Sequence, residues 1–493
     1  MGQTLLPILV ALPFAAAVVC LLLPTSQSVL QFVRLGVLGL VFPFALAICK
    51  VLSHGPLEAA GQWLRMDALS AYHLAVMMLV FVGGSCFSPV YFRKDIEEDH
   101  FSISRARRFG SLWFGALGAM TLVLSSNNLG ILWVGVEAST LLTAFLICIH
   151  RTPASLEAMW KYLIICSVGV AFAFMGTLLA GASASGRLPA TEALLWTHMM
   201  EIAPRLDPML IKAGFIFLLV GYGTKAGLAP MHSWLPDAHS QAPAPVSALF
   251  SGFLLNSAFY CVLRYIPIVE TALGHSGWSL RLLVFFGLLS ILVSSAFMVM
   301  QKDLKRLLAY STVEHIGIMA VGVGLGSAGA AASLFHLLNH SLGKTLAFLS
   351  AGRVGQLAGT NEIARLGGLL RGSFVWGVGL FWALLILSGV APFAVFFSEL
   401  QTLKAAADQG SWWTMGLFLF GVGVVFLAIL RHAIHLAWAP SNRDVSANSS
   451  SWLEKIVVLC PLALLFMLGI WMPESLQRVI REAAAIIVMG GRQ

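Results

Sequence analysis

Lys225 is the residue from which a functional interpretation of this sequence starts. It directly follows a long apolar run, and Pro230 and three further prolines then interrupt the chain. A lysine at the centre of a membrane helix costs about 2.5–3.5 kcal/mol on insertion scales. A broken backbone at that depth is tolerated only where it is buried in protein or lines a watery cavity. These residue types therefore favour ion or proton transfer through this segment.

Glu137 is a second ionisable residue inside an apolar run, in the stretch 127–150. A lone carboxylate in such a run is either neutral and hydrogen-bonded to a neighbouring helix, or paired with a cation. We predict that Glu137 is coupled to Lys225. Both would stay charged while they are close, and the lysine would lose its proton when they separate. A purely structural salt bridge is the alternative.

His336, His340 and Lys344 follow one another at four-residue spacing, which places them on one face of a helix. His315, on the preceding apolar run, extends this set. Each histidine alone would be interpreted as a hydrogen-bonded core residue, but a polar stripe on an apolar helix should face the bundle interior or a file of water. We predict a proton relay. A metal site would need three or four converging ligands without a lysine among them, so we expect none.

A second interrupted run lies far downstream, where Gly389 and Pro392 break an apolar stretch and Glu399 follows. We predict that Glu399 ends the proton pathway; a residue that caps the helix break near the membrane interface is the alternative. One interrupted span beside a charge in each half of a chain is typical of an inverted-repeat transporter.

Several polar residues near the first break receive a weaker assignment to the pathway. Lys161 is expected near a membrane interface, with its long side chain reaching water. His232 lies within the broken segment. Asp237 and His239 follow it closely, and they either cap the break or admit protons.

The composition is that of a membrane protein. The chain has 493 residues, of which 58% are hydrophobic and only 11% charged, against about 25% charged in an average soluble domain. Its mean hydropathy is +0.86. The seven cysteines lie in apolar runs without a C-x-x-C pair, and we expect no cofactor on this chain. No pattern indicates a redox or hydrolytic site, or binding to nucleic acid.

The hydrophobic runs predict an all-α polytopic membrane protein with about 14 spans, which forms a single transmembrane domain (1–493). Alternate connections are richer in Lys and Arg, with Arg264 assigned to a connection of the poorer set. This positive-inside bias places both termini outside the cytoplasm. We divide the domain into N-terminal spans (1–108), a first repeat (109–268), a second repeat (278–440), and a last span with its tail (452–493).

Several long motifs resemble one known family. The motif at 225–243 is K-x-x-x-x-P-x-H-x-W-L-P-D-A-H-x-x-A-P, and matching later elements are KDLKRLLAYSTVEHIG (302–317), NHSLGKTLAFLSAG (339–352) and the segment 392–399. Together they resemble the proton-translocating, antiporter-like subunits of respiratory complex I, of Mrp-type antiporters and of membrane-bound [NiFe] hydrogenases. Within that family the stretch 133–169 is most similar to hydrogenase-4 component F.

The resemblance implies a fold and roles for individual residues. It implies about 14 spans in two inverted repeats, with the seventh and twelfth spans broken. By position, Glu137 matches a fifth-span glutamate, Lys225 a seventh-span lysine, Lys344 an eleventh-span lysine, and Glu399 an ionisable twelfth-span residue. Asn256 stands where some relatives have an eighth-span lysine. The central relay would then pass through water, His315 or the stripe on the eleventh span.

The resemblance also implies a function and partners. We expect a proton-translocating membrane subunit of a complex I-like oxidoreductase in the cell inner membrane, most similar to a membrane-bound [NiFe] hydrogenase or formate hydrogenlyase. Its partners would be the lipid bilayer, other membrane subunits, and a peripheral redox arm with [NiFe] hydrogenase and Fe–S subunits. The alternatives are a subunit of NADH:quinone oxidoreductase, a subunit of a multisubunit Na⁺/H⁺ antiporter, and a scaffold subunit that does not pump.

Overall fold

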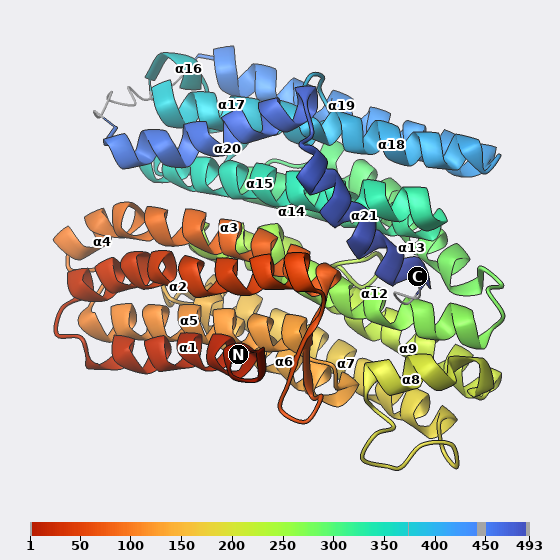
Figure 1. Cartoon of the computed structure of the whole chain (residues 1–493). Helices are drawn as coiled ribbons and strands as arrows, with labels where there is room; N and C mark the ends of the chain where they lie inside the picture. Colours follow the sequence, from red (N-terminus) through yellow and green to blue (C-terminus); the bar gives the residue numbers. More distant parts are fainter. Residues whose placement is uncertain (1, 373, 441–449, 490–493) are drawn as a thin grey trace.

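The computed structural model describes residues 2–372, 374–440 and 450–489, and these residues are almost entirely helical (Figure 1). One small antiparallel hairpin pairs β1 (Leu57–Ala59) with β2 (Leu64–Met66). Residue 1, residue 373, the polar linker 441–449 and the end of the tail, 490–493, lie outside the described residues. The all-α fold predicted from the sequence is confirmed. Helices suit a membrane because they satisfy each backbone hydrogen bond internally.

The first half of the chain contains α1 (Gly2–Leu22), α2 (Ser26–His54), α3 (Ala68–Tyr91), α4 (Arg93–Glu97), α5 (Ile103–Ser125), α6 (Leu129–Ile147), α7 (Pro153–Ser183), α8 (Trp196–Ile202), the 3₁₀ turn η1 (Ala203–Arg205), α9 (Pro208–Ala226), α10 (Trp234–Gln241), α11 (Ala244–Leu249), the π turn η2 (Phe250–Leu254) and α12 (Leu255–Ala272). The second half contains α13 (Trp278–Val299), α14 (Leu304–Gly324), α15 (Gly326–Ala358), the 3₁₀ turn η3 (Ile363–Arg365), α16 (Leu369–Gly372), α17 (Phe374–Leu387), α18 (Ala394–Asp408), α19 (Trp412–Trp438), α20 (Trp452–Ile470) and α21 (Glu474–Met489).

Twelve of the described helices are long and apolar enough to cross a membrane. The sequence predicted about 14 spans, and that number stays a prediction. The two numbers differ because two of the predicted spans are not among these twelve helices. α15 has 33 residues, about 50 Å at 1.5 Å per residue, but its polar stripe lowers its hydropathy. The broken run of α17 and α18 consists of two pieces that are each too short to count.

The helices form two groups that meet along a shared centre (Figure 1). Helices α1, α2, α3 and α5 lie on one side and α17–α20 on the other, with α14 and α15 between them. α21 crosses from one group to the other and packs on α3, α12 and α15. The site described below lies mainly where α14, α15 and α18 meet.

Glycines allow the closest helix pairs in each half. A Cβ on Gly176 of α7 would lie 2.6 Å from the carbonyl oxygen of Gly214 on α9. In the second half, a Cβ on Gly287 of α13 would lie 2.7 Å from the carbonyl oxygen of Gly317 on α14. Small residues let membrane helices approach this closely and gain dispersion energy, because lipid supplies no hydrophobic drive between them.

The two predicted helix breaks are confirmed, and they share one backbone pattern. The break between α9 and α10 has Gly227 at φ 85°, and the break between α17 and α18 has Gly389 at φ 72°. L-residues with a side chain disfavour these values, whereas glycine adopts them freely. A proline with a cis peptide bond, Pro230 or Pro392, follows each glycine. The letters are G-L-A-P and G-V-A-P, which supports two related halves.

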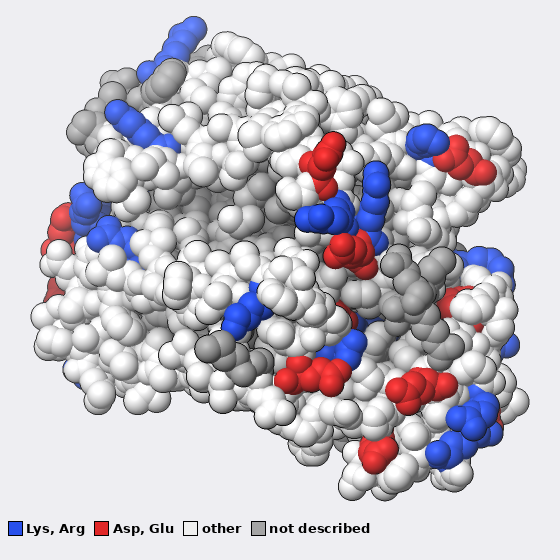
Figure 2. All heavy atoms as spheres, in the orientation of Figure 1, with Lys and Arg blue, Asp and Glu red and all other residues white. Residues whose placement is uncertain are grey.

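The face shown in Figure 2 carries few charges over most of its area. Large apolar side chains such as Phe42 and Trp413 are exposed on the molecule, as expected of a surface in contact with lipid. Charged side chains gather toward the ends of the bundle and where α21 crosses in Figure 1. A surface hollow along α21 is lined by Glu474, Ser475, Gln477, Arg478, Arg481 and Glu482.

Candidate functional site

Lys225 lies in the last turn of α9, one residue before the helix ends at Ala226, and it is fully buried. Its Nζ donates hydrogen bonds to Thr140 Oγ1 on α6 at 2.9 Å and to the Tyr162 hydroxyl on α7. The ammonium also lies 4.7 Å from the centre of the Tyr162 ring. The Tyr162 hydroxyl in turn hydrogen-bonds Thr143 at 2.7 Å. Hydroxyl groups and an aromatic face therefore replace the water that burial removes from the lysine.

Glu137 lies on α6 but does not form an ion pair with Lys225 within the described part of the chain. Ser167 Oγ donates a hydrogen bond to Glu137 Oε1 at 3.0 Å, and Oε2 is buried with no hydrogen-bond partner among the described residues. The predicted coupling of the two residues therefore stays a prediction. In this conformation the lysine and the carboxylate stand apart, with hydroxyl groups around the lysine.

His239, on α10, is fully buried, and both of its ring nitrogens lack a hydrogen-bond partner among the residues that the structure describes. The ring stacks on Phe348 of α15, with centroids 4.6 Å apart. On its other side it meets the edge of Phe250, whose ring is 5.7 Å from that of Tyr162. His239 therefore lies between the surroundings of Lys225 and α15.

The polar stripe of α15 points into the protein, because His336, His340 and Lys344 are each fully buried. Lys344 Nζ donates to the carbonyl oxygen of Leu308 at 3.0 Å. His340 Nε2 donates to the carbonyl oxygen of Ser251 at 3.1 Å. That carbonyl belongs to the π turn η2, and such turns free backbone groups from the helical ladder and often occur at functional sites.

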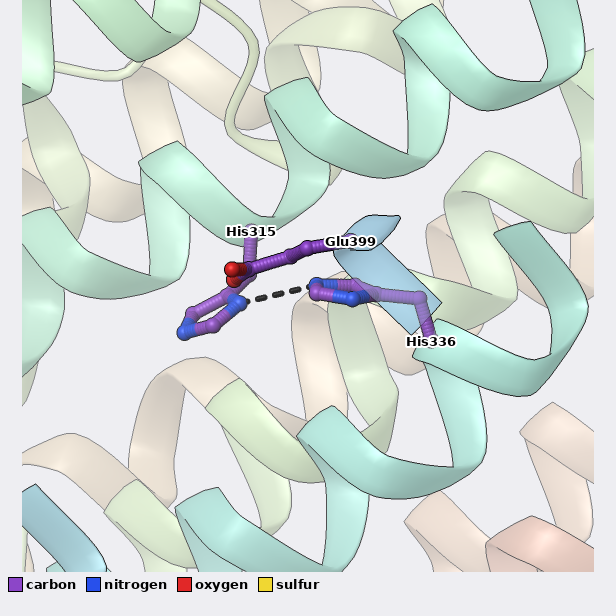
Figure 3. A group of neighbouring side chains, drawn as sticks. All are labelled: His315, His336 and Glu399. Carbon is purple, nitrogen blue, oxygen red and sulfur yellow. Dashed lines mark hydrogen bonds between the residues drawn. The ribbon is translucent and has the colours of Figure 1, made fainter. Parts of the chain in front are cut away.

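His315 of α14 joins this stripe, and Glu399 of α18 closes it (Figure 3). His315 Nδ1 and His336 Nε2 share a hydrogen bond of 2.8 Å, and the rings of His315 and His340 are 4.9 Å apart. The Glu399 carboxylate lies beside both His315 and His336. It also packs on the second helix break, because a Cβ on Gly389 would lie 2.3 Å from Glu399 Oε2.

The residues with a weaker assignment to the proton pathway lie around Lys225 and the polar stripe of α15 at different depths. Lys161 is half-exposed and bridges Asp237 at 3.1 Å, and Arg306 donates to the same carboxylate at 2.5 Å. His232 packs beside the rings of Phe297 and Tyr310. Asn256 donates to the Gly252 carbonyl oxygen and, at 3.2 Å, to Ser341 Oγ on α15.

Sequence reasoning missed several residues of this arrangement. Tyr162 and Thr140 look like ordinary members of apolar helices until the structure places Lys225 between them. Glu314, beside His315, is buried with Oε2 unpartnered. The sequence signal that could have identified Glu314 is an acidic residue inside the segment STVEHIG. Lys305 is also buried, and it donates to the carbonyl oxygen of Ala242, the residue that follows α10.

Arg264 is not in a connection, so its use as an orientation signal was wrong. It lies buried in α12 and donates to both oxygens of Asp67, at 2.6 and 2.7 Å. It also donates to Ser70 and to the Tyr260 hydroxyl. Loss of either partner would leave an uncompensated buried charge, which is strongly destabilising. The pair fixes the start of α3 to α12.

Comparisons with known proteins agree with these observations. A family model described as "NADH:quinone oxidoreductase/Mrp antiporter, TM" matches residues 126–425. The chain is 36% identical over 432 residues to a hydrogenase-4 component F homolog of Methylacidiphilum infernorum, which covers 87% of this chain and 90% of that protein. The region 126–425 that the family model matches contains both helix breaks and all the residues from Glu137 to Glu399 described above.

Two solved structures share the fold. One is a chain of the membrane-bound sulfane sulfur reductase, an archaeal respiratory membrane complex, with a TM-score of 0.85 and 24% identity over 98% of this chain and 97% of that one. The other is a chain of respiratory complex I from Thermus thermophilus, with a TM-score of 0.81 and 22% identity over 98% and 99%. Fold, motifs and the family match together place this chain in the family of antiporter-like membrane subunits of NADH:quinone oxidoreductases and Mrp antiporters.

Proposed function

We propose that this chain is the proton-translocating membrane subunit of a complex I-like oxidoreductase, most similar to a membrane-bound [NiFe] hydrogenase of the formate hydrogenlyase type. The observation that carries the proposal is one line of buried ionisable side chains that crosses the bundle. It runs from Lys225 through His239 to Lys344, the three histidines of α14 and α15, and Glu399. Ionisable groups are rare inside membrane proteins, and they mark ion and proton pathways.

The first part of the line is a lysine that can exchange its partners. Lys225 is held by neutral hydroxyl groups, so it gains no full charge pairing in this conformation. Approach of the Glu137 carboxylate would favour the protonated lysine, and its withdrawal would favour release of the proton. Redox-driven movement in a partner subunit would supply this change in distance.

His239 provides the link between the two halves of the line. The sequence left open how a proton passes Asn256, and Asn256 is itself bonded to the π turn and to Ser341. His239 offers two unpartnered ring nitrogens between the Lys225 surroundings and α15. A neutral imidazole accepts a proton on one nitrogen and releases one from the other. We therefore assign the central transfer to His239, with water completing the contacts on either side.

His340 and His315 continue the line toward Glu399. His340 Nε2 donates to a carbonyl oxygen, which only accepts, so Nδ1 carries the free lone pair of a neutral ring. His340 Nδ1 and His315 Nε2 have no hydrogen-bond partner in the described part of the chain, and their rings are 4.9 Å apart. A proton that reaches His340 therefore has a short path to His315 and then along the hydrogen bond to His336.

The test is the complex carrying Lys225→Ala, reconstituted in vesicles. We expect electron transfer to continue while proton translocation is lost or uncoupled, because the partner subunits hold the redox chemistry. His73→Gln is a matched control, because His73 is equally buried on α3 but lies outside the line. Unimpaired proton translocation by a folded Lys225→Ala complex would contradict the proposal. It is the result expected of a scaffold subunit that does not pump.

The family match also includes Mrp antiporters, so a Na⁺/H⁺ antiporter subunit is the second candidate. Proton movement that depends on Na⁺, rather than on an electron donor, would favour it. The hydrogenase assignment rests on the hydrogenase-4 component F homolog, which matches along most of both chains. Purification of this chain with its partners tests that assignment. We expect a large subunit with four nickel-ligating cysteines and Fe–S subunits.

We also place the chain in the cell inner membrane, with both termini outside the cytoplasm. The basic residues of one set of connections support this orientation, because Lys and Arg are enriched in cytoplasmic loops. Labelling of a single cysteine introduced at Gln3 in intact cells would test it. Labelling only after the membrane has been opened to the cytoplasmic side would contradict it.

A further inference from the structure

His315, His336 and Glu399 come from three different helices and meet at one point (Figure 3). One ligand atom of each lies within 4.8 Å of those of the other two. The two histidines are fully buried, and Glu399 is 6% exposed. Figure 3 shows the side chains of Glu399 and His336 extending from the same side of the view toward the ring of His315, with the Glu399 carboxylate next to that ring.

The three donors are those of an open zinc site. Two imidazole nitrogens and one carboxylate oxygen bind Zn²⁺ in several enzymes and leave a fourth position free. Imidazole suits Zn²⁺, Cu²⁺ and Ni²⁺, whereas Na⁺ and Mg²⁺ prefer oxygen alone. With metal–ligand distances of about 2.0–2.2 Å, tetrahedral ligand atoms lie about 3.4 Å apart. The separations here, 2.8 Å between the histidine nitrogens and at most 4.8 Å overall, lie on both sides of that value.

Ser398 orients one of these ligands. Its hydroxyl donates to the carbonyl oxygen of Val395 at 2.8 Å, so it accepts from His336 Nδ1 at 2.9 Å. The proton of a neutral His336 is therefore on Nδ1, and the lone pair of Nε2 points at His315. Metal-binding histidines almost always have such a partner on the other nitrogen. His315 Nε2 has no hydrogen-bond partner within the described ranges, so it can take the proton that Nδ1 must give up to a metal.

A surface hollow opens where α15, α18 and α21 meet. The hollow, of about 400 Å³, is lined by Phe335, which precedes His336 on α15, and by Gln401, which follows Glu399 by two residues on α18. Lys404, Asp408 and Arg481 also line it. The hollow therefore opens beside the two helices that carry His336 and Glu399.

We propose that His315, His336 and Glu399 bind one divalent transition-metal cation of the zinc class, and that the bound cation stops proton transfer along α14 and α15. The binding site stands on the three ligands and on Ser398. The proposal that the cation stops proton transfer rests on the proposed function, because it requires that these same atoms carry protons. The sequence predicted no metal, since it showed only the stripe on α15 with a lysine, and the carboxylate ligand comes from another helix.

The test measures metal binding by the purified full-length chain in detergent, with Co²⁺ as the probe and Zn²⁺ as its competitor. We expect one Co²⁺ per chain with the strong visible absorption of a four-coordinate ion, displaced by Zn²⁺. His336→Gln and Glu399→Gln should each weaken binding more than about 100-fold, because each removes a ligand. Ser398→Ala should weaken it by about 10- to 100-fold, the effect of removing an outer partner.

His73→Gln, another buried histidine, should leave Co²⁺ binding unchanged. Circular dichroism and size-exclusion chromatography identify which variants fold, and Ser398→Ala is the mildest change of the set. Failure of the wild-type chain to bind Co²⁺ stoichiometrically, or binding that survives Glu399→Gln or Ser398→Ala unchanged, would overturn the site. If Co²⁺ binds as expected but Zn²⁺ leaves proton translocation by the reconstituted complex unaffected, the site stands and the pathway through it fails.

Discussion

At the scale of single residues, the ionisable groups of this chain are kept inside the membrane by neutral partners. Lys225 bonds to two hydroxyl groups, Lys344 to a backbone carbonyl, and His336 to a serine. A full salt bridge would hold each charge in place, as the pair of Arg264 and Asp67 does. Neutral hydrogen bonds are weaker than charge pairs, so they leave these groups free to change protonation.

Tyr162→Phe removes the hydroxyl group that accepts a hydrogen bond from Lys225 Nζ, but it keeps the aromatic ring that the ammonium faces. We expect a loss of stability of about 1–3 kcal/mol, because a buried ammonium loses one acceptor. Fewer protons should be moved per electron, with electron transfer retained, as measured in reconstituted vesicles. Tyr265→Phe is the matched control, because its buried hydroxyl bonds only to Thr177 in the described hydrogen bonds. Equal effects of the two substitutions would contradict a role for Tyr162.

At the scale of elements, the two broken helices position the two ends of the line. The first break begins two residues after Lys225, at Gly227, and the second packs on the Glu399 carboxylate. A broken helix exposes backbone groups that a continuous helix would use internally. The π turn η2 does the same for Ser251, whose carbonyl oxygen binds His340. Irregular backbone therefore occurs where the line needs polar partners.

Gly389→Ala tests the contact between the second break and Glu399. The added Cβ would meet Glu399 Oε2 at 2.3 Å, so the carboxylate must shift from its position beside the histidines. Gly410→Ala is the control, since Gly410 has a similar φ of 66° but nothing within 4 Å of its Cβ. Both should cost about 1–2 kcal/mol of stability from the left-handed backbone. Only Gly389→Ala should also reduce proton translocation. Equal proton translocation by the two variants would contradict a role of the contact between the second break and Glu399.

At the scale of the whole molecule, the sequence predicted the fold class and the two breaks because their signals are local. Prolines, and charges such as Lys225 and Glu399 in apolar runs, stand out without knowledge of the fold. The contacts of Tyr162 and the meeting of His315 with Glu399 depend on how distant helices pack, which no local pattern contains. Arg264 was misplaced for the same reason, because its partner Asp67 lies in a different part of the chain.

The central claim is that the buried line moves protons across this chain, and Lys344→Met tests it most directly. The substitution keeps an unbranched side chain in the interior but removes the amine whose only described hydrogen bond is to Leu308. The measurement is the number of protons translocated per electron by the reconstituted complex. We expect this ratio to fall while electron transfer continues. A ratio equal to that of the unaltered complex, with Lys344→Met folded and assembled, would contradict the account.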